Sequence, residues 1–283
     1  MPETSTNSLQ NLLEYAQRSM LISTNIGSRQ RHEIGYSMVE RTVPDYNFIH
    51  VTRGKVVWVV DGQHIPLGPG DLVVVPPRIK HHAYCETKKV TLSSLHIVAR
   101  LPGGRDVFDL LGAPLTQHVP FGTRLDFYLR SASDEWDRPT PVVIQQEWGW
   151  ALLVTREYFR YNFEQNLLKP RMADPLVSSL LIMLERYRNR PVSLAELARQ
   201  AGYAPQHLNR VFSKALGVTP LQYLARVKLE HAARLLREGD LKVSAIAQAV
   251  GFDDPYYFSR VFAQQFGSSP AEFRARACSD YPS

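Results

Sequence analysis

The sequence predicts an α+β protein in which an N-terminal β-sandwich or β-barrel is followed by an all-helical part. Short apolar runs separated by Gly and Pro turns occupy residues 34–98. Helical spacing of apolar residues dominates from residue 174 onward. A helix-turn-helix pattern occurs twice in that second part. With 283 residues, 44% of them hydrophobic, the chain can build two domains with ordinary cores.

The strands are read from residue 34 onward, after a polar segment over residues 1–30 that we expect to form a mobile arm. Apolar runs at 48–51 and 56–60 precede Asp61-Gly62, which has the turn chemistry of a two-residue hairpin. A Gly-Pro-Gly turn at 68–70 leads into a strand at 72–75, which ends at two prolines. Two more strands are expected near 82–85 and 90–98.

Residues 101–169 are expected to be mostly helical. Leu125, Tyr128 and Leu129 share one helix face, and residues 142–163 form a second helix that is broken or bent near Gly149. The pattern fits an oligomer interface and burial within the first domain equally well. A helix also begins at Asp174-Pro175.

Composition excludes several classes of protein. No apolar run approaches the roughly 20 residues that span a membrane, and residues 1–10 are polar, which predicts cytoplasmic residence. Cys85 and Cys278 are too few for a disulfide framework or a thiolate zinc site, so free thiols are expected. Residues 171–283 hold 15 Lys and Arg against 10 Asp and Glu, and so carry +5 of the formal charge of +6. The basic excess favours an anionic partner for the helical part.

An internal repeat organises the helical part. Residues 197–203 match 246–252 at an offset of 49, and residues 205–223 match 255–273 at an offset of 50. Each copy has a short helix, a Gly-aromatic bend and a second amphipathic helix, as in helix-turn-helix units at about 194–216 and 243–266.

Local signals place the helix ends within this repeat. Ser193 and Glu196 fit a capping box, and Gly202 and Gly251 suit bends with positive φ. A helix from Thr219-Pro220 to about residue 237 would span roughly 27 Å, somewhat less than one turn of B-DNA at about 34 Å. The linking helix can therefore hold two reading heads in successive major-groove segments.

These motifs resemble the AraC/XylS family of bacterial transcription regulators. The resemblance over residues 171–283 rests on GFDDPYYFSRVF at 251–262, FGSSP at 266–270 and GVTP at 217–220. Residues 31–170 resemble the family's cupin-like sensor domain through LGPGDL at 67–72 and the prolines at 76–77 before His81-His82. The resemblance implies a cupin-like β-barrel or jelly roll with a helical extension, followed by a DNA-binding domain with two helix-turn-helix units.

Candidate DNA contacts lie on the exposed faces of the two second helices. The resemblance implies base contacts from Gln206, Asn209 and Arg210 in the first copy, and from Tyr256, Ser259 and Arg260 in the second. Arg recurs at equivalent positions 210 and 260, which favours contact with DNA over a merely solvated side chain. Tyr256 would stack, contact a thymine methyl group or pack against Tyr257. Lys214 and Gln264 are expected to face phosphates.

The sensor half offers fewer candidates. His50, Trp58, Tyr84 and His96 are predicted to line an organic-ligand pocket, with a core filled by side chains as the alternative. Metal-binding cupins use a His-x-His pair, but Phe48 stands where the first His of a pair ending at His50 would be. No metal and no cofactor are therefore expected.

The leading hypothesis is a non-enzymatic, sequence-specific DNA-binding transcription regulator. Its expected partners are promoter or operator DNA, a small-molecule effector, a second copy of the chain and RNA polymerase, with a place at the bacterial nucleoid and none at a membrane. The alternative is a cupin-type metal-dependent enzyme whose helical domain makes protein contacts. A third hypothesis is a first domain that binds no ligand and serves only oligomerisation.

Overall fold

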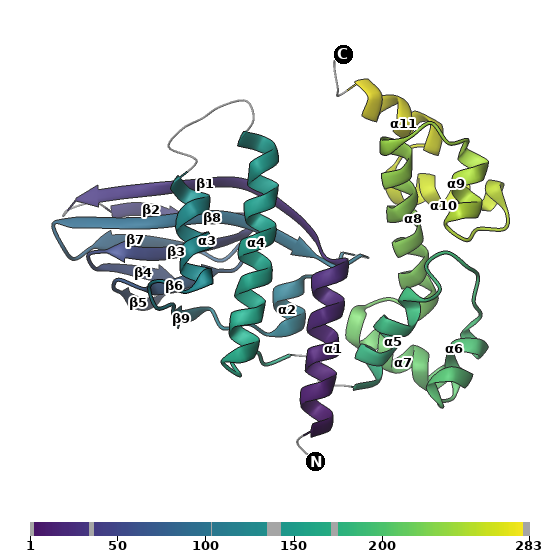
Figure 1. Cartoon of the computed structure of the whole chain (residues 1–283), viewed down its shortest axis with the longest axis horizontal. Helices are drawn as coiled ribbons and strands as arrows, with labels where there is room; N and C mark the ends of the chain where they lie inside the picture. Colours follow the sequence, from purple (N-terminus) through teal and green to yellow (C-terminus); the bar gives the residue numbers. More distant parts are fainter. Residues whose placement is uncertain (1–2, 34–36, 103, 135–142, 171–174, 280–283) are drawn as a thin grey trace. The chain divides into compact units, whose positions relative to one another are not determined.

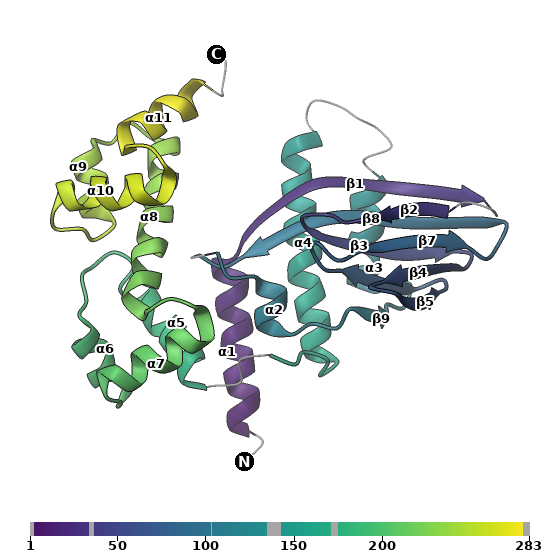
Figure 2. The ribbon, with the colours of Figure 1, turned by 180° about the vertical axis from the view of Figure 1, so that it is seen from behind.

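The computed structural model describes residues 3–33, 37–102, 104–134, 143–170 and 175–279. The chain divides into two compact units (Figures 1 and 2). One unit comprises Met20–Arg100 and Asp106–Arg171, and is called the sheet unit below. The other comprises Met1–Ser19, Leu101–Arg105 and Met172–Ser283, and is called the helical unit. In the part of the chain that is described, no helix is long and apolar enough to cross a membrane.

The sheet unit consists of two antiparallel sheets, as the predicted fold class requires. The five-stranded sheet has the order β1-β8-β3-β6-β9, and the four-stranded sheet has the order β2-β7-β4-β5. The strands are β1 (Leu21–Glu33), β2 (Ser37–Arg41), β3 (Tyr46–Arg53), β4 (Val56–Val60), β5 (Gln63–Leu67), β6 (Asp71–Val75), β7 (His81–Cys85), β8 (Lys89–Arg100) and β9 (Thr116–His118).

Turn chemistry fixes the hairpin between β4 and β5. Asp61 and Gly62 both have positive φ, 51° and 77°, as a two-residue turn of the type predicted from the sequence requires. The turn pairs Val60 with Gln63, so the register of both strands follows from it. The expected Asp-Gly hairpin is confirmed.

The core of the sheet unit lies between the two sheets. Alternate residues of both sheets meet there, with Ile49 and Val51 of β3 facing Val56 and Trp58 of β4 in one apolar cluster. Aromatic rings cover the opposite face of the five-stranded sheet, where Phe48 contacts Phe108 and Tyr158. Both faces of β3 are therefore buried.

Three helices cover that outer face: α2 (Val107–Leu111), α3 (Arg124–Asp134) and α4 (Val143–Glu164) (Figure 1). Leu125 and Leu129 of α3 and Val154 and Tyr158 of α4 are buried against the unit itself. Burial within the first domain thus accounts for these apolar faces. α4 runs unbroken through Gly149, unlike the expected break there.

The helical unit contains α1 (Glu3–Ser19), α5 (Pro175–Glu185), α6 (Leu194–Ala201), α7 (Pro205–Leu216), α8 (Pro220–Glu238), α9 (Val243–Ala249), α10 (Pro255–Phe266) and α11 (Pro270–Ser279). In Figure 1, α8 runs from the group of α5, α6 and α7 to the group of α9, α10 and α11. α5 begins at the predicted place, although the expected cap at Asp174 lies outside the described residues.

The first 33 residues differ from the expected mobile arm. They form α1 and then β1, which pairs with β8 over its length. α1 packs on α5, and its Leu12, Tyr15 and Ala16 are buried. A helix with this much buried surface is a fixed part of the helical unit.

Candidate nucleic-acid interface

The first helix-turn-helix consists of α6 and α7. Ser193 caps α6 by accepting a hydrogen bond from the Glu196 amide, while the Glu196 carboxylate pairs with Arg199 instead of closing the predicted capping box. Gly202 has φ of 73°, which permits the left-handed bend between the helices. Pro205 then opens α7, which spans the predicted residues.

The second helix-turn-helix consists of α9 and α10 and repeats this construction. Gly251 has φ of 74°, and Pro255 is the first residue of α10. Asp254 caps α10 by accepting a hydrogen bond from the Tyr256 amide at 2.8 Å. Phe258 and Phe262 are buried on its inner face, in one apolar cluster with Ile246 of α9. The helix predicted for this stretch is confirmed.

The predicted contact residues of α7 lie on its outer side. Gln206, Arg210 and Lys214 are exposed, while Asn209 is half-buried. The Asn209 Oδ1 atom is buried and has no hydrogen-bond partner among the described residues. A buried amide oxygen of this kind needs a donor from a ligand or from water.

The corresponding residues of α10 present a different surface. Tyr256 is 88% exposed, and Arg260 and Gln264 are also exposed. The Ser259 hydroxyl donates a hydrogen bond to the Pro255 carbonyl at 2.9 Å, and so points along its own helix. Tyr256 presents its side chain to solvent.

Each exposed Arg lies against an aromatic ring three residues before it. The Arg210 guanidinium donates to His207 Nδ1 at 3.2 Å, and the His207 ring stacks on Tyr203 with centroids 5.3 Å apart. In this pair the rings are almost parallel, at 14°.

The second copy also places its Arg against a ring, but over the ring face and with the two rings tilted by 44°. The Arg260 guanidinium lies 5.3 Å from the centre of the Tyr257 ring, and Tyr257 lies 6.1 Å from Phe252. Either contact restricts the rotamers of the guanidinium, and in the second copy the guanidinium edge stays free for hydrogen bonds. We name these two sets the Arg–aromatic stacks: Tyr203–His207–Arg210 and Phe252–Tyr257–Arg260.

His207 and Tyr257 were absent from the residues proposed from the sequence. They occupy equivalent positions at an offset of 50, each with a ring three residues before an Arg. The recurrence of an aromatic residue three positions before each Arg is the sequence signal that marks them.

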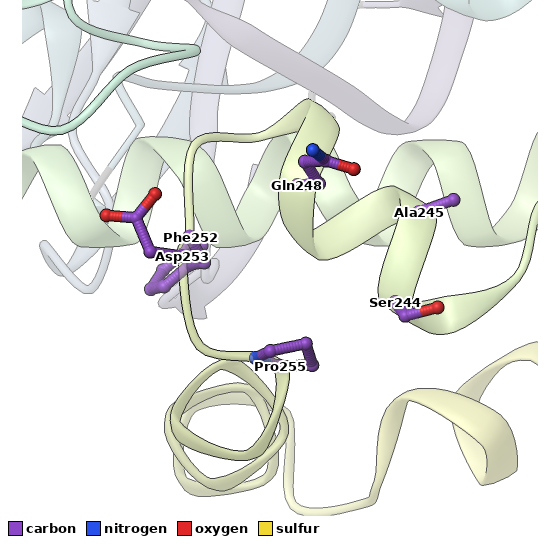
Figure 3. A pocket seen from close by; sticks show the side chains of 6 residues that line it. All are labelled: Ser244, Ala245, Gln248, Phe252, Asp253 and Pro255. Atoms are coloured by element: carbon purple, nitrogen blue, oxygen red, sulfur yellow. The ribbon is translucent and has the colours of Figure 1, made fainter.

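A pocket of about 390 Å³ lies beside the second helix-turn-helix (Figure 3). Ser244, Ala245 and Gln248 line it from α9, with Phe252 and Asp253 from the bend and Pro255 from α10. Ser244, Gln248 and Asp253 supply hydrogen-bonding groups to it beside the start of α10, and its other lining residues are apolar.

The four residues predicted for a ligand pocket in the sheet unit do not come together. Trp58 belongs to the core between the sheets, and strand alternation turns His96 toward the same interior. His50 lies on the opposite face of the five-stranded sheet, under α3. Tyr84 is 36% exposed, and its hydroxyl contacts His64 Nδ1 at 3.2 Å. The four side chains thus line no common cavity.

Two of these histidines face carboxylates. His96 Nδ1 and Asp45 Oδ1 are 2.7 Å apart, whereas His50 Nε2 is 4.0 Å from Asp126 Oδ1, with both side chains fully buried. Burial lowers the pKa of His50 to about 4, so His50 is neutral at neutral pH. Among the described residues no group of three or more His, Cys, Asp or Glu side chains is placed to hold a metal ion. Cys85 is a free thiol.

Comparison with known proteins agrees with this architecture. Residues 197–276 match the helix-turn-helix domain family, and residues 40–98 match the cupin domain family. The chain is 34% identical over 105 residues to the probable transcription factor PqrA of Proteus vulgaris, which covers 36% of this chain and 86% of PqrA. It is 27% identical over 257 residues to the transcriptional activator RhaR of Klebsiella pneumoniae, which covers 84% of this chain and 88% of RhaR.

Some matches cover only the helical part. The DNA-binding domain of AdpA, solved with a target DNA, is 28% identical and covers 38% of this chain and 96% of that chain, with a TM-score of 0.36. Three further curated regulators are matched over only 32% to 36% of their own length, so the chain spans about a third of them.

A cupin domain followed by two helix-turn-helix units with exposed Arg side chains defines a class of transcription regulators. The chain belongs to the AraC/XylS family, with the AraC-type helix-turn-helix DNA-binding domain at its C-terminal end.

Proposed function

We propose that this protein is a sequence-specific transcription regulator whose two helix-turn-helix units read successive major-groove segments of one DNA site. The observation that carries the proposal is the duplicated Arg–aromatic stack. Arg210 and Arg260 occupy equivalent exposed positions, and each guanidinium contacts the ring three residues before it, Arg210 through a hydrogen bond to His207 Nδ1 and Arg260 over the face of the Tyr257 ring. A restrained guanidinium is suited to bidentate contact with guanine, because less rotamer freedom is lost on binding.

The neighbouring side chains supply the remaining contacts. We assign base contacts to Gln206, Asn209 and Arg210 in the first unit and to Tyr256, Ser259 and Arg260 in the second. Gln and Asn pair bidentately with adenine, and Tyr contacts a thymine methyl group or stacks. Lys214 and Gln264 lie one turn further along and are assigned to phosphates.

The length of α8 supports simultaneous binding of the two units. Its 19 residues span about 28 Å, somewhat less than one turn of B-DNA at about 34 Å. Its centre is buried, with Leu229, Ala232 and Leu236 packed against the second unit, so it is a rigid link rather than a flexible linker.

For the sheet unit we propose a regulatory rather than an enzymatic role. It would bind a small-molecule effector, join two copies of the chain, or do both, and so set how two DNA-binding units are arranged. The cupin-type enzyme remains the competing function, and its support is limited to isolated histidines. We further propose that the regulator acts at bacterial nucleoid DNA, in the cytoplasm, together with RNA polymerase.

Gel-shift titration of the full chain tests the proposal. DNA from upstream of its own and adjacent genes is titrated at several salt concentrations, with Arg210→Ala, Arg260→Ala and the double variant. Each single change should weaken specific binding by about 5- to 150-fold, which corresponds to one bidentate base contact of about 1–3 kcal/mol. Arg234→Ala, which removes an exposed charge from α8, is the matched control.

Two results would contradict the assignment. Unchanged affinity and unchanged sequence preference in the double variant would remove the stacked arginines from the interface. Equal loss on specific and random DNA would make them phosphate contacts, because base contacts alone carry sequence preference. Stoichiometric metal after gentle purification would favour the enzyme, and stability shifts with sugars, aromatic acids or amino acids would favour an effector over a purely oligomerising unit.

A further inference from the structure

Lys228 is a buried lysine in the middle of α8. It is 6% exposed, and its ammonium donates hydrogen bonds to the Arg190 carbonyl at 3.0 Å and to the Gly251 carbonyl at 2.9 Å. Burial lowers the pKa of the Lys228 ammonium, and the charge of Asp253 acts in the opposite direction. Burying an ammonium group costs free energy unless its N–H groups are hydrogen-bonded. The two hydrogen bonds offset this cost, and the burial of a lysine at this position needs an explanation.

One carbonyl belongs to the segment that enters the first helix-turn-helix, and the other belongs to the second helix-turn-helix. Arg190 lies in the turn that leads from α5 into α6, and Gly251 lies in the bend between α9 and α10. Their main chains touch: a Cβ atom on Gly251 would lie 2.6 Å from the Arg190 nitrogen and 2.7 Å from the Asn189 carbonyl carbon. Lys228 therefore bonds both sides of a direct contact between the segment that enters the first helix-turn-helix and the bend of the second.

The contacts continue from this point to α10 on the second side and to α6 on the first. On the second side, the Lys228 ammonium lies 5.6 Å from the centre of the Phe252 ring, the base of the stack that ends at Arg260. On the first side, the Arg190 guanidinium lies 4.5 Å from the centre of the Tyr187 ring, and the Tyr187 hydroxyl accepts a hydrogen bond from Gln200 of α6.

We propose that Lys228 is a positioning residue that fixes the second helix-turn-helix relative to the first, and thereby sets the separation of the two base sequences the chain recognises. The proposal rests on the proposed DNA binding. Helix α8 by itself fixes only the axis that joins the two helix-turn-helix units. The two hydrogen bonds fix the second unit's position at its bend, where a small rotation would carry α10 away from its groove.

The geometry of DNA makes this separation measurable. One added base pair moves a half-site by about 3.4 Å along the duplex and by about 36° around it. A rigid pair of units cannot follow both changes, whereas a loosened pair can. Spacing tolerance thus reports on the contact between the units, independently of overall affinity.

The first test needs no DNA. Spin labels are placed at Ala195→Cys on α6 and Ser244→Cys on α9, which are exposed and equivalent in the repeat. The full chain carries Cys85→Ser and Cys278→Ser. Pulsed electron resonance should give a narrow distance distribution with Lys228, a broader one with Lys228→Met, and a narrow one again with Lys228→Arg, which keeps a buried donor.

The second test uses double-stranded DNA selected by the wild-type chain from a random pool. The selected site is rebuilt with one base pair inserted or removed between its halves. The wild type should lose about tenfold or more in affinity on the altered sites, which is the loss of one bidentate contact or more. For Lys228→Met, the fall in affinity from the selected site to the altered sites should be clearly smaller than for the wild type. Arg234→Met, the charge-matched control on α8, should show the same ratio of affinities as the wild type.

The outcomes separate the two proposals. Failure of the wild type to select any DNA would overturn the proposed function, while the distance measurement would still decide the role of Lys228. Wild-type distances and wild-type spacing ratios in a folded Lys228→Met or Lys228→Gln protein would overturn the positioning role. Unfolding of both variants would also overturn it, because Lys228 would then serve stability rather than spacing.

Discussion

The buried hydrogen bond between the hydroxyls of Tyr15 and Tyr223 joins α1 to α8. Tyr15 is 4% exposed and Tyr223 is 1% exposed. The Tyr223 ring also meets the buried Phe212 of α7 edge-on, with centroids 5.7 Å apart. Replacing either tyrosine by Phe removes one hydroxyl and keeps the ring, so the hydrogen bond is tested without a cavity.

The expected change in the free energy of unfolding depends on which hydroxyl each variant leaves buried without its partner. Tyr15→Phe leaves the Tyr223 hydroxyl buried without its partner, which costs about 1–3 kcal/mol. Tyr223→Phe should cost less, because the Ser19 hydroxyl also lies beside Tyr15. The double variant leaves neither hydroxyl, so its cost should be smaller than the sum of the single changes.

Urea unfolding monitored by circular dichroism, with hydrogen exchange of residues 3–19, measures these changes. A cost of 1 kcal/mol corresponds to a fall of about 2–8 °C in melting temperature for domains of this size range. Tyr256→Phe is the matched control, since that tyrosine is 88% exposed. Single variants with unchanged stability and unchanged hydrogen-exchange protection of α1 would refute the role of this hydrogen bond in holding α1 against α8.

Three further predictions follow from the same structure. Burial raises the pKa of Tyr15 and of Tyr223, so the stability these groups contribute is complete below the unfolded pKa of about 10 and falls as the pH rises above it. Urea unfolding from pH 8 to 11 should show this loss, and the double Phe variant should show less of it. Tyr257→Ala should weaken DNA binding by about 2- to 5-fold with an unchanged salt slope, which corresponds to an exposed cation–π contact of about 0.5–1 kcal/mol under Arg260, and Tyr257→Phe should restore it. Ser193→Ala should cost about 1 kcal/mol by removing the cap of α6, measured by thermal unfolding, and no loss would refute that role for the hydroxyl.

Local chemistry made the reading helices predictable. Pro205 and Pro255 begin helices at the expected residues, and Gly202 and Gly251 have the expected positive φ. These features depend on one residue and its own backbone, so no tertiary information is needed. The internal repeat confirmed each local signal by a second occurrence.

The first 33 residues were not predictable in the same way. α1 is polar on average, and its helix depends on packing Leu12 and Ala16 against the helical unit. β1 has little apolar alternation. It forms main-chain hydrogen bonds with β8, and its side-chain pattern does not predict them. Both elements exist because of partners distant in sequence.

The four residues predicted to line a ligand pocket in the sheet unit do not lie together, for a related reason. β3 is buried on both faces, so its sequence lacks the alternation that tells an inward residue from an outward one. His50 therefore read as a barrel-lining residue, although Ile49 faces the interior and His50 faces α3. The face of a doubly buried strand is set by its register with neighbours, which composition does not reveal.

The two Arg–aromatic stacks bear on what each monomer reads. The copies share the stacked Arg but differ beside it: Gln206 and Asn209 stand where the second copy has Tyr256 and Ser259. The Asn209 oxygen has no donor among the described residues, whereas the Ser259 hydroxyl donates within its own helix and keeps only its acceptor capacity. A common anchor with different neighbours gives two units of similar geometry and different base preference, so the site of one monomer should be asymmetric. Two unlike half-sites define one sequence only when their separation is fixed. In the proposed role, Lys228 fixes that separation and so contributes to sequence specificity.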